Sequence, residues 1–153
     1  MLQPEFDSLP SYSAMLREAL SDFLAPGAHC FLQMLADDAV MEFPYAPPGI
    51  VGRLEGHAAI TAHVNGLGHI LTIEQMTDLV VYPTTRPGVV VLEFGCLGSG
   101  VSTGNPYNQT YISVITLRDG HIVHYRDYWN PLVVLGAMEQ GEAAPEAPAG
   151  GAN

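Results

Sequence analysis

The chain has 153 residues, of which 48% are hydrophobic and 14% charged, enough for one sizeable core but too short for two ordinary domains. Its formal net charge of −11 repels nucleic-acid phosphates and anionic lipid, so neither nucleic acid nor a membrane is an expected partner. The first residues lack a basic segment followed by an apolar one, and we expect a cytoplasmic protein.

Three helices are predicted in the first half of the chain, because apolar residues recur there at helical spacing. The first begins after Pro10 and Ser11, which suit a helix start, and the second is expected to end at Asp37 and Asp38. Gly56 begins the third. The first span is 12–24, the second begins at Phe31, and the third is 57–67.

Long segments rich in β-branched and aromatic residues predict strands Ala39–Phe43, Ile70–Tyr82, Val89–Val101, Tyr107–Leu117 and His121–Trp129. Helices followed by a run of strands are typical of an α+β fold. We expect a curved antiparallel sheet wrapped around the N-terminal helices, forming a cone with a central pocket. Residues 1–138 are predicted to form this single domain, and the Ala-, Pro- and Gly-rich residues 139–153 a disordered tail.

The last predicted strand carries an aspartate among aromatic residues. Alternation along the strand places Val123, Tyr125, Asp127 and Trp129 on one face, and Ile122, His124, Arg126 and Tyr128 on the other. Arg126 therefore points away from Asp127 and does not neutralise it.

The pairing of this strand with the preceding one depends on the turn at Asp119 and Gly120. A two-residue turn places Asp127 opposite Ile112, whereas a turn with a bulge at Gly120 places it opposite Tyr111. We favour the second register, because the first leaves a carboxylate among apolar side chains without partners. The pocket face predicted by this register comprises Tyr107, Gln109, Tyr111, Ser113, Tyr125, Asp127 and Trp129.

His63 is a second candidate for chemistry. It shares a helix face with Ile60, Val64 and Leu67, so it should point toward the sheet and the pocket. A lone histidine on an apolar face is also commonly a packed core residue, and both interpretations stay open.

The proline-rich stretch Pro44–Gly52 is interpreted either as a packed connection or as a lid over an apolar ligand. Phe43 and Tyr45 beside it are further candidates for substrate binding. His57, at the start of the third predicted helix, is another candidate, with a helix-start contact as its alternative role.

No metal or cofactor site is predicted. His121 and His124 are three residues apart in a predicted strand and point to opposite faces. Cys30 and Cys96 have no metal-ligand spacing and are interpreted as buried apolar residues.

Three stretches carry a resemblance to a known superfamily: LADDAVMEFP, the helix start GHAAI and the C-terminal YRDYWNPL. With the order of the predicted elements, they resemble the SnoaL-like proteins of the NTF2-like superfamily over roughly residues 10–138. This resemblance implies a cone of helices wrapped by a curved sheet. It also implies a homodimer formed through the outer sheet face, which bears His124, Arg126 and Tyr128.

Within this superfamily the chain is most similar to the phenazine-biosynthesis A/B group. The helix histidine of that group falls on His63 and its acid on Asp127, whereas a serine that the group uses nearby falls on Leu67. The general-base aspartate of ketosteroid isomerases falls on Phe43, so their mechanism is not expected. The last strand also resembles that of limonene-epoxide hydrolases, whose Arg-x-Asp pair has no clear counterpart here.

The residues and the resemblance together predict proton-transfer chemistry. A carboxylate in an apolar pocket has a raised pKa, and a nearby imidazole holds or exchanges its proton. Asp127 and His63 are the predicted acid/base pair of a cofactor-independent isomerase, cyclase or hydrolase acting on a small hydrophobic cyclic or polyketide-like molecule. The alternative is a non-catalytic ligand-binding or accessory protein, because one fold hosts both functions.

Overall fold

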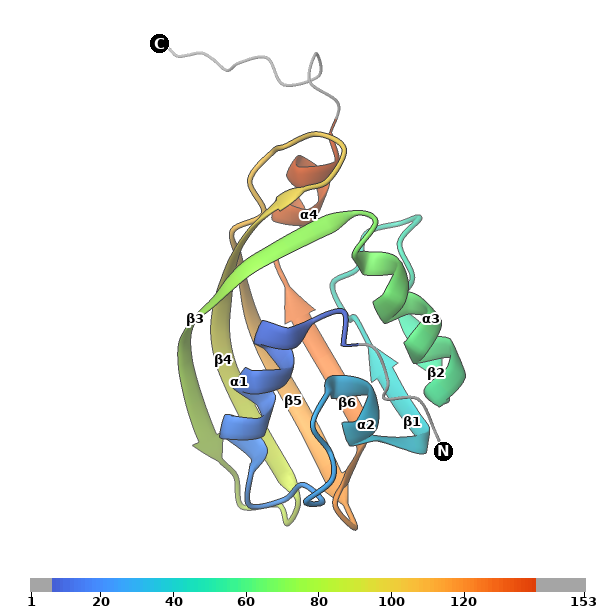
Figure 1. Cartoon of the computed structure of the whole chain (residues 1–153), viewed down its shortest axis with the longest axis vertical. Helices are drawn as coiled ribbons and strands as arrows, with labels where there is room; N and C mark the ends of the chain where they lie inside the picture. The colour runs from blue at the N-terminus through green and yellow to red at the C-terminus, as the bar shows by residue number, and fades with distance from the viewer. Residues whose placement is uncertain (1–6, 140–153) are drawn as a thin grey trace.

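The computed structural model describes residues 7–139 and shows a curved six-stranded sheet with helices packed on one face (Figure 1). The helices are α1 (Pro10–Leu20), α2 (Phe31–Met34), α3 (His57–Leu67) and α4 (Pro131–Met138). The strands are β1 (Leu35–Glu42), β2 (Arg53–Glu55), β3 (Leu71–Pro83), β4 (Val89–Gly100), β5 (Gln109–Arg118) and β6 (His121–Trp129). The predicted α+β fold is confirmed, while the predicted tail lies outside the described residues from residue 140 onward.

One strand pair departs from the predicted antiparallel sheet. The strand order is β2-β1-β6-β5-β4-β3, and β1 runs parallel to β6, whereas all other neighbours in this order are antiparallel. Met41 lies opposite Tyr125, and Glu42 lies opposite Arg126. The first strand thus lies directly beside the last one and brings Met41 to the strand that carries Asp127.

The β5–β6 hairpin has neither of the two predicted registers. Its turn residues Asp119 and Gly120 both have positive φ, 56° and 83°, as a tight two-residue hairpin turn requires. The pairing then shifts between Thr116 and Leu117, which leaves Val123 as an extra, bulged residue in β6. The sequence has no glycine at this bulge and so gave no signal for it.

The bulge places Asp127 opposite Ser113, two residues from the favoured partner Tyr111. A shift of two residues leaves every side chain on its own face, so Tyr111 and Asp127 still share the inner face of the sheet. Ile122 was predicted on the opposite face from Tyr125, but it precedes the bulge and is fully buried in the same core as Tyr125.

Two helix ends differ from the predictions. α1 ends at Leu20 rather than at Leu24, because the amide of Phe23 donates to the Leu20 carbonyl and tightens the last turn. Asp37 and Asp38, predicted at a helix end, lie in β1. β2, for which no strand was predicted, lies before α3 and pairs with β1.

α4 was not predicted, although its start has a clear chemical pattern. The Asn130 side chain accepts a hydrogen bond from the Leu132 amide at 3.0 Å, and Pro131 is the first helical residue. Gly100 of β4 allows the helix to approach, because a Cβ there would lie 2.3 Å from the Ala137 carbonyl oxygen. α4 therefore packs against one end of the sheet.

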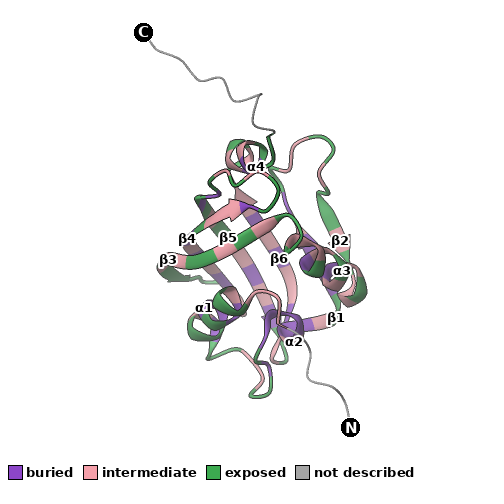
Figure 2. Cartoon of the chain, turned by 45° about the horizontal axis from the view of Figure 1, so that its top comes forward, coloured by how far each residue is buried: buried purple, intermediate pink, exposed green. Residues whose placement is uncertain are grey.

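The main core lies between the inner face of the sheet and the helices α1, α2 and α3. Figure 2 shows buried residues concentrated on the central strands, whereas β3 at the sheet edge has no buried residue. In the described part of the chain, none of the helices has the length and hydropathy that crossing a bilayer requires.

Candidate active site

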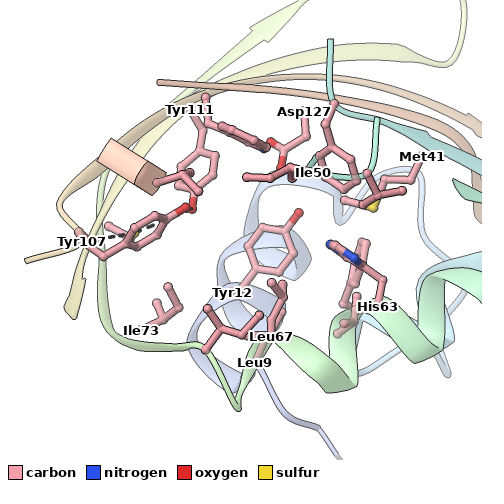
Figure 3. Close-up of a pocket in the computed structure, with 18 of the residues that line it drawn as sticks. Leu9, Tyr12, Met41, Ile50, His63, Leu67, Ile73, Tyr107, Tyr111 and Asp127 are labelled. Atoms are coloured by element: carbon pink, nitrogen blue, oxygen red, sulfur yellow. Dashed lines mark hydrogen bonds between the residues drawn. The ribbon is translucent and has the colours of Figure 1, made fainter. Parts of the chain in front are cut away.

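A cavity of about 370 Å³ lies between the inner face of the sheet and the helices (Figure 3). Most of its wall is aliphatic or aromatic. The side chains with polar groups that line it are Tyr12, His63, Cys96, Tyr107, Tyr111, Asp127 and Trp129. A mostly apolar cavity with a few convergent polar groups is typical of a site for a small organic molecule.

Asp127 of β6 is the one carboxylate in the cavity wall formed by the described residues, and it is 9% exposed. Within residues 7–139 its carboxyl has one hydrogen-bond partner, Ser113, whose Oγ donates to Oδ1 at 3.2 Å. Burial raises the pKa of Asp127 to about 8, and the Ser113 hydrogen bond offsets part of that effect. The group can therefore take up or release a proton near neutral pH.

Two tyrosines extend this contact into a longer network. The Tyr125 hydroxyl lies 2.9 Å from Ser113 Oγ, and the Tyr12 hydroxyl donates to the Tyr125 hydroxyl. Tyr12, Tyr125 and Ser113 together form a hydroxyl chain that ends at Asp127. Figure 3 shows Tyr12 rising from α1 toward the side of the cavity that holds Asp127.

His63 extends from α3 into the cavity, as predicted, and its ring packs on Phe43 with 5.3 Å between centroids. Phe43 packs in turn on Trp129 at 6.1 Å, so both predicted aromatic residues belong to the wall. Burial lowers the pKa of His63, which keeps its ring neutral near pH 7. No hydrogen bond joins His63 to Asp127 in the described residues, so the predicted pair shares the cavity without a direct bond.

Tyr107 and Tyr111 line the cavity at the other end, as predicted. Their hydroxyl oxygens are 2.8 Å apart, and the Tyr111 ring stacks on Phe94 with 4.9 Å between centroids. Burial raises the pKa of Tyr107 to about 12 and raises that of Tyr111 as well. Both phenols therefore stay neutral, and because one hydroxyl donates its proton to the other, the second keeps a proton that it can donate to a ligand.

Two predicted binding residues lie away from the cavity. Tyr45 is 60% exposed and packs on Tyr128 with 5.3 Å between ring centroids. His57 donates from Nε2 to the Leu32 carbonyl oxygen at 2.7 Å, so it ties the start of α3 to α2. The helix-start contact, which was the alternative role for His57, is the one that the structure shows.

Two further predicted residues are buried on the correct face but do not reach the cavity. The Gln109 side chain donates to the Asn130 carbonyl at 3.0 Å and accepts from the Asn130 amide at 2.9 Å, which anchors the end of β6. Tyr125 is fully buried and lies behind the wall in the hydroxyl chain. Strand alternation gives the face of a residue but not the partners that its polar atoms find.

Sequence reasoning missed several parts of the wall. Tyr12 was assigned only to a helix core, since its partner Tyr125 lies 113 residues further along the chain. Val134 and Met138 come from the helix α4, which was not predicted, although Asn130-Pro131 is a recognisable helix start. Residues 49–51, within the stretch Pro44–Gly52, also line the cavity, which is compatible with both a packed connection and a lid.

Among the residues that the structure describes, no lysine or arginine side chain lines the cavity. The chain has five Lys or Arg residues, all of them arginines outside the wall: Arg17, Arg53, Arg86, Arg118 and Arg126. Within residues 7–139, no cluster of three or more His, Cys, Asp or Glu side chains is arranged to hold a metal ion. An anionic ligand would therefore meet a carboxyl and a neutral imidazole but no side-chain cation.

The family model of the SnoaL-like domain matches residues 16–125. The chain belongs to the SnoaL-like family. A PhzA/B-like protein of Pseudomonas aeruginosa is 46% identical over 109 residues, which cover 70% of this chain and 75% of that protein.

Solved structures agree with this family and with the NTF2-like fold. A candidate isomerase from Bacillus subtilis is 41% identical, with a TM-score of 0.70, and the match covers 81% of this chain and 92% of that chain. An NTF2-like protein from Burkholderia xenovorans LB400 has a TM-score of 0.62 at 19% identity, covering 85% and 91% of the two chains. The second likeness shows the fold alone.

Proposed function

We propose that this SnoaL-like protein is a cofactor-independent acid/base enzyme of the isomerase or cyclase type. The observation that carries the proposal is Asp127, a carboxyl in an apolar cavity whose pKa burial raises to about 8. A general acid or base works best when its pKa lies near the operating pH. Asp127 thus has the property that moving a proton to or from a carbon atom requires.

The proposed substrate is a small, uncharged and largely apolar molecule, cyclic or polyketide-like. The cavity offers aromatic rings for its body and a few hydroxyl groups for its polar atoms. Binding an anion would require a cation, and all five arginines lie elsewhere. This preference for uncharged molecules supports ketone or enol chemistry over chemistry on acids or phosphates.

His63 and the tyrosines supply the other proposed contacts. The neutral imidazole of His63 is proposed to exchange a proton or a hydrogen bond with the substrate. Of the paired hydroxyls of Tyr107 and Tyr111, the one that accepts within the pair is the proposed donor to an oxygen that gains negative charge during the reaction.

Among the predicted reaction types, hydrolysis receives the least support. Epoxide-hydrolase-like chemistry uses an arginine beside its carboxylates, and no arginine lines this cavity. The Bacillus subtilis relative, at 41% identity, is described as a candidate isomerase. Both observations favour proton shifts or ring closure.

The proposal is tested with an uncharged cyclic ketone, 1-tetralone. In D₂O, proton abstraction at its α-carbon exchanges hydrogen for deuterium, which NMR or mass spectrometry measures. We expect the wild-type protein to accelerate this exchange and Asp127→Asn to lower the rate by about 10²-fold or more, a typical general-base contribution. The matched control, Glu42→Gln, removes a carboxylate on the outer face and should keep the wild-type rate.

Two results would contradict the proposal. One is a wild-type protein that does not accelerate the exchange. The other is an Asp127→Asn variant that retains the wild-type rate. Binding of 1-tetralone without exchange would favour the non-catalytic ligand-binding function.

A further inference from the structure

The hydroxyl chain connects two separate points of the cavity wall. Tyr12 comes from α1, and Asp127 comes from β6, and both line the cavity. Tyr125 and Ser113 complete the connection between them and lie behind the wall, both fully buried. A ligand in the cavity can therefore contact both ends of the chain but neither of its middle members.

The hydrogen bonds of the chain have a fixed direction when Asp127 is ionised. A carboxylate only accepts, so Ser113 donates its one proton to Asp127. Ser113 then accepts from Tyr125, because each hydroxyl has a single proton to give. Tyr125 accepts from Tyr12, and all three protons point from the Tyr12 end toward Asp127. The oxygen of Tyr12 is left to accept a proton from the cavity.

We propose that the hydroxyl chain is a proton relay that joins Tyr12 to Asp127, so that the enzyme moves a proton between an oxygen and a carbon of one substrate. This inference rests on the proposed function and adds a second reacting point to it. It also narrows the substrate class to molecules with an enol, phenol or ketone oxygen that reaches Tyr12 while an α-carbon reaches Asp127.

Each proton that the relay moves leaves one group of the site or substrate and is bound by the next. The substrate O–H bond breaks as its proton passes to Tyr12, while the protons of Tyr12, Tyr125 and Ser113 each move one oxygen along. The last proton forms an O–H bond on Asp127, which then gives that proton to the substrate carbon. An enol becomes a ketone, every hydroxyl regains one proton, and Asp127 returns to its ionised form. Enolisation is the reverse of these steps.

The proposed relay depends on its two buried middle residues, Tyr125 and Ser113. Burial and the neighbouring Asp127 raise the pKa of both Tyr12 and Tyr125, so a phenolate at either position is unfavourable. Tyr12 can release its proton toward the substrate only if it receives another from Tyr125. A break in the buried part of the chain should therefore stop proton delivery at Tyr12 without changing the cavity wall.

The decisive variant is Tyr125→Phe, tested in the 1-tetralone exchange assay. We expect kcat to fall by about 10²-fold, the lower end of the usual contribution of a proton-transfer group. KM should stay unchanged, because Tyr125 does not line the cavity. Tyr12→Phe should lower kcat by a similar factor, and the double variant should lose no more than either single variant, since both break one relay. Tyr82→Phe, which removes an exposed hydroxyl bonded to Glu93, is the matched control.

A Tyr125→Phe variant with wild-type kcat, alongside an inactive Asp127→Asn variant, would overturn the relay and leave the proposed function intact. Additive losses in the double variant would also overturn it. If Tyr125→Phe does not fold, Ser113→Ala interrupts the same chain and should give the same loss of kcat. Failure of the wild-type protein to exchange 1-tetralone is a distinct result that contradicts the proposed function itself.

Discussion

The two faces of the sheet hold their carboxylates in opposite ways. On the outer face, Glu42 lies 2.6 Å from His124 Nε2 and 2.7 Å from Arg53, and these partners lower its pKa. On the inner face, none of the five arginines lines the cavity beside Asp127, and burial raises its pKa to about 8. The strands that carry the two residues are neighbours, and Glu42 lies opposite Arg126.

The cations on the outer face thus separate a face with paired carboxylates from the inner face, where the proposed reactive carboxyl of Asp127 lies. A carboxylate that is paired with cations on the outer face of the sheet stays ionised and contributes only to local stability. Buried on the inner face without such a partner, the Asp127 carboxyl has a raised pKa, and we propose that it exchanges its proton with a substrate. The homodimer predicted from the resemblance would use the outer face and stays a prediction.

The largest predicted effect concerns stability and pH. The folded state holds the Asp127 proton up to about pH 8, whereas the unfolded chain releases it at about pH 4. Between these values the wild-type protein should lose stability as the pH rises, because its folded state binds more protons. The Asp127→Asn variant has no such proton. Its free energy of unfolding, relative to that of the wild type, should therefore rise by about 1.4 kcal/mol per pH unit.

Urea denaturation of both proteins across this pH range measures the effect. Because His63 is present in both proteins, its own titration cancels in the difference. A difference in the free energy of unfolding that does not change with pH would contradict the raised pKa of Asp127.

A smaller effect is expected on the pKa of Asp127 when Ser113 or His63 is replaced. Ser113→Ala removes its one hydrogen bond and should raise the Asp127 pKa further, by about one unit for a net hydrogen bond of about 1.4 kcal/mol. His63→Phe should leave that pKa close to the wild-type value, since no hydrogen bond joins the two side chains. A titration followed by NMR checks both variants. The opposite pattern would support the direct pair that the sequence predicted.

The smallest effect is expected on the outer face. The lowered pKa of Glu42 stabilises the folded state above the unfolded pKa, and this contribution is lost as the pH falls through the folded pKa. Glu42→Gln should therefore cost at most about 1 kcal/mol at neutral pH and nothing in acid. Thermal unfolding at both pH values, with and without salt, measures it, and a cost that persists in acid would rule out the ion pairs as its source.

The sequence predicted most of the fold because the large elements have strong periodic patterns. α3 was predicted with its observed bounds, and β6 as well. α4 and β2 were not predicted, since one is short and uniformly apolar and the other has three residues. The register of β6 was wrong because it depends on the bulge at Val123, which only the packed sheet reveals.

The candidate site was predicted in part, because local periodicity places some of its side chains and not others. Alternation along β6 placed Asp127 on the inner face, and helical spacing placed His63 toward the sheet. Neither pattern contains the long-range contact between Tyr12 and Tyr125. The face on which a side chain lies follows from local periodicity. Its hydrogen-bond partners depend on how elements that are distant in the sequence pack together.

Titration of the Asp127 carboxyl itself shows most directly whether burial in the cavity raises its pKa. Its side-chain carbonyl carbon is followed by ¹³C NMR, with Asp127→Asn used to assign the signal. We expect a midpoint near pH 8, set by burial in the cavity. A midpoint near pH 4, the ordinary value for an exposed aspartate, would contradict it.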